Sequence, residues 1–68
     1  MLKKRSLSLA GHATSLALEP EFWAVLDQMA AADGVSLAEL IGRIDEERGA
    51  SLLASACRVR TLAWVQRG

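Results

Sequence analysis

The sequence predicts a small, mainly helical protein that opens with a short β-ribbon. Two stretches near the amino terminus, RSLSLA and ATSLAL, alternate leucine with small or polar residues, as half-buried strands do. At Glu19-Pro20-Glu21 this period of two changes to the period of a helix. Further along, SLAE has the serine-to-glutamate spacing of a capping box, which indicates the start of another helix.

The two strand patterns can be connected in two ways. Before Gly11-His12 the leucines occupy odd-numbered positions, and after it they occupy even-numbered ones. One straight strand would therefore place Leu7 and Leu9 on the opposite face from Leu16 and Leu18. A hairpin with Gly11 first in a type II′ turn removes this conflict and places Leu7 opposite Leu16. The alternative is a bend or linker at Gly11-His12, which leaves only the second stretch to pair, with another chain.

Three helices are expected to follow the strands. Pro20 suits the first helical position of the first helix, and Gly34 suits the left-handed residue that ends it. Ser36 is the expected cap of the second helix, and Ser51 that of the third. At 68 residues the chain is one domain. We therefore expect residues 1–12 to be a basic arm or an extra strand, 13–18 the ribbon strand, and 20–33, 36–48 and 51–66 the helices.

Charge is unevenly distributed, although the formal net charge is zero. Residues 1–18 contain Lys3, Lys4 and Arg5 and no acid, whereas all eight acids lie in residues 19–47. A basic start can be a solvated, frayed terminus. It can also be an electrostatic footprint for phosphates beside the strand, which makes these three residues candidate phosphate contacts.

Several function classes are disfavoured by composition. Cys57 is the only cysteine and His12 the only histidine, so neither an intrachain disulfide nor a zinc site is expected, and we expect no metal or cofactor. No acid–base pair, nucleophile–base set or phosphate loop is visible, so we expect no enzyme. No stretch approaches the roughly 20 apolar residues of a membrane span. We expect a cytoplasmic protein that gains stability by self-association.

The stretch TSLALEPEFWAVLDQMAAADGVSLAELIGRID, residues 14–45, resembles the ribbon–helix–helix family of DNA-binding proteins. With KRSLSLAGHA before it and IDEERG and LLASACRVRTLAWV after it, nearly the whole chain is similar to a branch of short bacterial members. The resemblance implies an intertwined homodimer in which two chains pair one strand each into an antiparallel ribbon, here with a third, carboxy-terminal helix added. That ribbon enters the major groove of DNA.

The family pattern assigns expected roles to residues of this chain. Ala13, Ser15 and Ala17 match the outward, base-facing positions, and the start of the second helix at Val35 and Ser36 matches a phosphate site. The expected dimer core comprises Leu16, Leu18, Phe22, Leu26, Leu37, Leu40, Ile41 and Ile44. Members of this branch often have arginine where Ala13 stands, so base readout here is expected to be weak, with Lys3, Lys4 and Arg5, and also Ser6 and Ser8, as substitutes.

Two functions follow as expectations. The first is a dimeric, DNA-binding regulator of transcription, such as a repressor, whose partners are a second copy of the chain and double-stranded DNA. The alternative is a protein-interaction or antitoxin-like dimer with weak or no sequence-specific DNA binding. The third helix motivates this alternative, because it carries more apolar surface than a free monomer should expose and could bind another protein.

Overall fold

The amino-terminal strands form a hairpin in the computed structural model, which describes residues 1–67. Strands β1 (Lys3–Leu9) and β2 (His12–Leu18) pair antiparallel around a two-residue turn at Ala10-Gly11. Both turn residues have positive φ, 52° and 80°, as a type I′ turn requires. The hairpin interpretation is therefore confirmed, and β1 is a strand for most of the segment that could have been a basic arm.

The register of the hairpin differs from the expected one. The turn lies one residue earlier than Gly11-His12, so Leu7 faces Thr14 and Arg5 faces Leu16. A type I′ turn matches the right-handed twist of the flanking strands, and in this register all seven residues of each strand are paired. Each β1 residue pairs with a β2 residue two positions before the expected one. Because side chains alternate between faces with a period of two, this shift leaves the leucines of both strands on one face.

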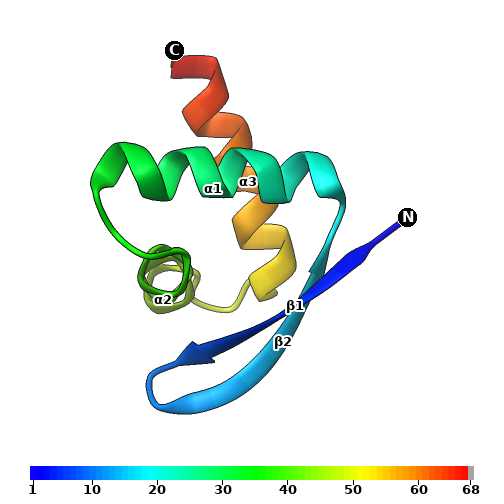
Figure 1. Ribbon diagram of the computed structural model, residues 1–68, viewed down its shortest axis with the longest axis vertical. Coiled ribbons are helices and arrows are strands. Elements are labelled where there is room, and N and C mark those ends of the chain that lie inside the picture. The colour runs from blue at the N-terminus through cyan, green and yellow to red at the C-terminus, as the bar shows by residue number, and fades with distance from the viewer. Residues whose placement is uncertain (68) are drawn as a thin grey trace.

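Three helices follow the hairpin (Figure 1): α1 (Pro20–Asp33), α2 (Leu37–Glu47) and α3 (Leu53–Arg67). Gly34 ends α1 in the left-handed conformation, with φ at 67°, and the side chain of Ser36 caps α2. The expectation that Ser51 caps the third helix was wrong. Ser51 belongs to the preceding turn, where its N–H donates to the carbonyl of Arg48 (3.1 Å), and α3 begins two residues later.

The hydrophobic core is closed within the single chain. Of the eight residues expected in a dimer core, Leu16, Leu18, Leu26, Leu40, Ile41 and Ile44 are buried, and Phe22 and Leu37 are partly buried against them. Helix α3 contributes Cys57 and Thr61 to this core, at 0% and 1% exposure. The residues expected in the dimer core thus already pack together within one protomer.

Trp23 is among the most deeply buried side chains of the core. It is 2% exposed, whereas Phe22, which was expected in the core, is only partly buried. The indole Nε1 donates a hydrogen bond to the backbone carbonyl of Lys3 at 2.8 Å. A large aromatic side chain thus packs under β1 with its one polar atom satisfied, which fixes this strand on α1.

Two kinds of feature are absent from the residues that the structure describes. None of the helices in residues 1–67 has the length and apolar composition needed to cross a bilayer. Within the same residues, no group of histidine, cysteine, aspartate and glutamate side chains is arranged to hold a metal ion.

Candidate nucleic-acid interface

The outer face of the hairpin is the flat surface that points away from the helices. It consists of Lys4, Ser6 and Ser8 from β1 and Ala13, Ser15 and Ala17 from β2. The register places these residues in three cross-strand pairs, Lys4 with Ala17, Ser6 with Ser15, and Ser8 with Ala13. Five of the six are exposed and Ala17 is partly exposed. Strand alternation explains this face, because the leucines of the same strands point inward and pack on the core.

The structure brings the three expected base-facing residues together with the two serines expected as substitutes. Ala13, Ser15 and Ala17 lie on the outer face, and Ser6 and Ser8 extend it across β1. The alternation in RSLSLA was the available signal, since it already placed both serines opposite the leucines.

The three expected phosphate-binding cations line one hollow beside the start of α1, but successive side chains of a strand point to opposite faces. Lys4 is on the outer face. Lys3 and Arg5 lie on the inner side of the sheet, the side to which the leucines of β1 also point. The guanidinium of Arg5 donates to both carboxylate oxygens of Asp27, at 3.0 and 3.3 Å. It also lies over the ring of Trp23, 4.6 Å from the centroid. Arg5 thus binds α1 in this structure, and no local sequence signal marks Asp27 as its partner.

The expected phosphate site at the start of α2 is engaged in capping. The hydroxyl of Ser36 accepts from the N–H of Glu39 at 3.0 Å, and the N–H of Val35 donates to the carbonyl of Ala30 at 3.0 Å. Among residues 1–67, no side-chain hydrogen bond or ion pair joins this turn to the hairpin. Val35 and Ser36 thus each take part in a hydrogen bond that shapes the turn between α1 and α2.

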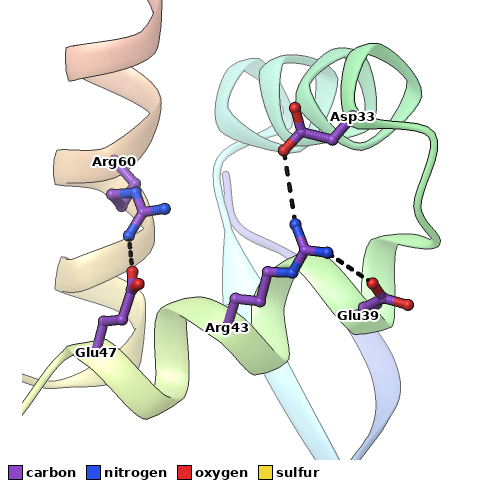
Figure 2. A network of polar contacts seen from close by, with 5 residues as sticks. All are labelled: Asp33, Glu39, Arg43, Glu47 and Arg60. Atoms are coloured by element: carbon purple, nitrogen blue, oxygen red, sulfur yellow. Dashed lines mark hydrogen bonds and ion pairs between the residues drawn. The ribbon is translucent and has the colours of Figure 1, made fainter.

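Acids of the helices are largely paired with arginines of the same chain. Figure 2 shows Arg43 between Glu39, at 2.8 Å, and Asp33, at 3.8 Å, with the pair formed by Arg60 and Glu47 beside it. Arg48 pairs in the same way with Asp45 at 2.6 Å. The pairs of Arg43 with Asp33 and of Arg60 with Glu47 join α2 to α1 and α3. All four pairs offset negative charge on the helical side of the molecule.

Glu19, the acid that directly follows the ribbon, is also neutralised. Its carboxylate accepts from Nε and Nη2 of Arg58 on α3, at 3.0 and 2.9 Å. A backbone hydrogen bond at Glu19, followed by the bond from Arg58, lowers the pKa of this carboxyl. The hairpin itself, residues 3–18, contains three cations and no acid. Its outer face is thus the acid-free side of a protein whose net charge is zero.

Comparisons with known proteins agree with this architecture. A family model described as "Ribbon-helix-helix domain" matches residues 2–65. The chain belongs to the ribbon–helix–helix family. Members of this family are commonly DNA-binding regulators or antitoxins, typically form dimers and are typically non-enzymatic.

A solved relative has the same ribbon–helix–helix fold. It is an uncharacterized protein from Bordetella pertussis Tohama I, with a TM-score of 0.81 and 42% sequence identity. The match covers 94% of this chain and 55% of that one, so the chain spans about half of its relative's length. No match is found among curated proteins.

This ribbon–helix–helix chain has a strand pairing within a single protomer. One edge of β2 pairs with β1 of its own chain, in addition to the pairing between two chains that the family pattern implies. A single protomer therefore carries a complete two-stranded antiparallel ribbon. The physical reason lies in the sequence, because Lys3–Leu9 alternates like a strand and Ala10-Gly11 provides the turn that brings it back.

Proposed function

We propose that the protein is a DNA-binding regulator of transcription that acts as a homodimer and inserts the hairpin into the major groove. The outer face would lie against the base edges, with Ala13, Ser15 and Ala17 in the positions that the family uses for readout. Lys4 would contact a flanking phosphate. Lys3, Arg5 and the start of α2 at Val35 and Ser36 are proposed as further phosphate contacts.

The observation that carries this proposal is the acid-free, two-stranded outer face. The major groove, about 12 Å wide, admits a two-stranded β-ribbon, and strands lie about 4.8 Å apart. Small side chains on the ribbon allow its backbone to approach the floor of the groove. Since the hairpin has no carboxylate, no group on it would be repelled by the phosphates.

Weak sequence discrimination is expected from this face. The three serine hydroxyls can donate or accept single hydrogen bonds to base edges. Alanine and serine cannot make the bidentate contacts with guanine or adenine that are worth about 1–3 kcal/mol of discrimination each. Phosphate contacts should therefore dominate the affinity, which should fall steeply as salt rises.

The test is the salt dependence of binding to a fluorescently labelled, random-sequence duplex. Replacing Lys4 with alanine should weaken binding and reduce the slope of log K against log salt by about 1 for each protomer. The matched control is Arg67→Ala, which removes one cation at the end of α3, on the opposite side of the molecule from the hairpin (Figure 1). Equal effects of the two variants, or no salt-dependent binding at all, would contradict the proposal.

A second candidate function is a protein-interaction module of the antitoxin type. It is favoured by the apolar side chains exposed in α3 and at the residue before it, Leu52, Val59, Leu62 and Val65, which are 53–77% exposed. A protein of this kind would bind a partner through α3 and would bind duplex DNA weakly or without salt dependence. The same titration therefore separates the two candidates.

A further inference from the structure

The first residues of β1 and the start of α1 border a hollow of about 340 Å³. We call it the basic hollow and define it by the residues that line it, Lys3, Lys4, Arg5, Pro20, Trp23 and Ala24. In the described part of the chain, β1 pairs with β2 along one edge only, so its other edge is open. Long side chains from both faces of the strand can reach around an open edge. Cations that alternate between the two faces can therefore line the same space.

The charge of the basic hollow sets it apart from two other hollows on the surface. Those two lie between the helices and contain arginines together with an acid, Asp33 in one and Glu47 in the other. Among the residues that the structure describes, no acid lines the basic hollow. Three cations without a carboxylate in the same walls produce a positive potential there. The basic hollow thus favours an anionic ligand.

Two of its three cations are free to bind such an anion. Five of the eight cations of the chain pair with an acid of the same chain, namely Arg5, Arg43, Arg48, Arg58 and Arg60. Within residues 1–67 the ammonium groups of Lys3 and Lys4 form no ion pair, and both residues are exposed. Each ammonium group has three N–H donors and no acceptor. Two unpaired ammonium groups therefore meet at one hollow.

Arg5 is held at the basic hollow by contacts that leave most of its donors available. Its guanidinium lies over the ring of Trp23, 4.6 Å from the centroid, and the indole is fixed by the hydrogen bond from its Nε1 to the Lys3 carbonyl at 2.8 Å. The bonds to Asp27 use two of the five N–H donors of the guanidinium. The stacking on Trp23 does not depend on Asp27, so Arg5 can stay in place while it donates to another anion.

We propose that the basic hollow binds a phosphate group, to which Lys3 and Lys4 donate from their ammonium groups and Arg5 from its guanidinium. Three cations match the charge and the several acceptor oxygens of a phosphate better than those of a carboxylate. The inference rests on the proposed function and names one place for the phosphate contacts that this function needs. That place is distinct from the outer face, where base edges would lie.

Two sources can supply the phosphate group. One is the backbone of DNA, which would pass the open edge of β1 while base edges face the outer face. The other is a free phosphorylated small molecule, since a volume of about 340 Å³ lies at the lower end of the range of small-molecule sites. The chemistry of recognition is the same for both, so the experiment must compare a free anion with a duplex.

NMR titration of the ¹⁵N-labelled protein tests the site. Inorganic pyrophosphate would be added to one sample and a short duplex to another, with chloride used to hold the ionic strength constant. We expect saturating shifts at the backbone amides of residues 3–5 and at the indole N–H of Trp23. The indole N–H of Trp64 is the internal control and should not shift, because Trp64 lies on α3 and lines a different hollow.

The two ligands distinguish the sources. Saturation by the duplex alone identifies the DNA backbone as the source, whereas saturation by pyrophosphate shows that a free phosphate group also binds. Either result supports the site, and absence of these shifts with both ligands would overturn it. The outer face is a separate readout. If residues 3–5 respond while Ser6 and Ser15 do not respond to the duplex, the proposed function fails and the phosphate site stands.

Variants of the two lysines test whether the charges carry the binding. For the ligand that saturates the site, the double variant with Lys3→Gln and Lys4→Gln should bind at least about tenfold more weakly, since charge-assisted hydrogen bonds are lost. The control Arg67→Gln removes a cation outside the hollow and should change the affinity by less than about twofold. All three positions are exposed, so circular dichroism should report folded chains. A double variant that binds as tightly as Arg67→Gln would overturn the proposal.

Discussion

At the scale of single residues, the hairpin turn shows how one position sets the register of a ribbon. Ala10 adopts a φ of 52°, a left-handed conformation that costs an L-residue with a Cβ roughly 1–2 kcal/mol. Gly11 adopts a φ of 80° without this cost. The sequence pointed to a turn at this glycine but not to its position within the turn, because alanine in a left-handed conformation has no sequence signal.

Replacing Ala10 with asparagine should stabilise the protein. Asparagine visits the left-handed region readily, and Asn-Gly is the preferred type I′ dipeptide. We expect a gain of about 0.5–1 kcal/mol, or a rise of a few degrees in Tm for a domain of this size. Thermal unfolding followed by circular dichroism measures it. A lower Tm would indicate that position 10 lies within a strand and that the turn is at Gly11-His12.

Cys57 predicts a loss of stability at alkaline pH. Burial, followed by the nearby charge of Asp45, raises the pKa of its thiol to about 11. Below the thiol pKa of the unfolded chain, about 8.5, both states are neutral and the contribution to folding is fully present. As pH rises from there towards 11, the unfolded chain ionises first and stability falls. Urea unfolding between pH 8 and 10.5 should show this decline, and Cys57→Ala should show a smaller one.

At the scale of elements, the attachment of β1 to α1 is the contact that sequence patterns could not indicate. Local alternation was sufficient to assign the faces of both strands, and the motifs around Pro20, Gly34 and Ser36 located three helix ends. The contacts of Arg5 with Asp27 and of Trp23 with the Lys3 carbonyl join residues about twenty positions apart. They arise only when the strand is packed on the helix.

Releasing Arg5 should strengthen DNA binding. The ion pair with Asp27 is exposed at both ends, with side-chain exposures of 41% and 51%, so its loss should cost at most about 1 kcal/mol of stability. In Asp27→Asn the guanidinium no longer has a carboxylate partner and can bind a phosphate. We expect tighter binding to random-sequence duplex and a steeper salt slope, by up to about 0.9 for each added contact.

The control for this prediction is Asp33→Asn, which makes the same change of charge on the same helix. Asp33 pairs with Arg43 at the other end of α1 (Figure 2). Equal gains in the two variants would mean that net charge alone, and not the release of Arg5, governs the affinity.

At the scale of the whole molecule, α3 and β1 both contribute to a core that forms within one chain. The sequence indicated the composition of the core, because the apolar stripes of α1 and α2 are periodic. It did not indicate that one chain suffices to bury them, since burial by a partner and burial by a third helix produce the same pattern. The sequence feature that could have indicated burial by the third helix was its large apolar surface. The structure shows that the face with Cys57 and Thr61 packs into the core.

Two substitutions that add a charge to the outer face test DNA binding separately from folding. Ala13→Arg should strengthen DNA binding by adding a charge-assisted contact, whereas Ser15→Glu should abolish it by placing a carboxylate near phosphates. Both positions are exposed, so stability should change by no more than about 0.5 kcal/mol. If gel-shift titrations show neither effect in folded proteins, the ribbon is not the DNA-binding surface.

Mapping by NMR tests most directly the central claim that the outer face of the hairpin binds DNA. The ¹⁵N-labelled protein would be titrated with a short duplex at low salt, and the shift of every backbone amide followed. We expect the largest changes at Ser6, Ser8, Ala13 and Ser15, with smaller ones along α3, and reversal of the changes when salt is added. Saturating changes confined to α2 or α3, with the hairpin amides unmoved, would contradict the claim.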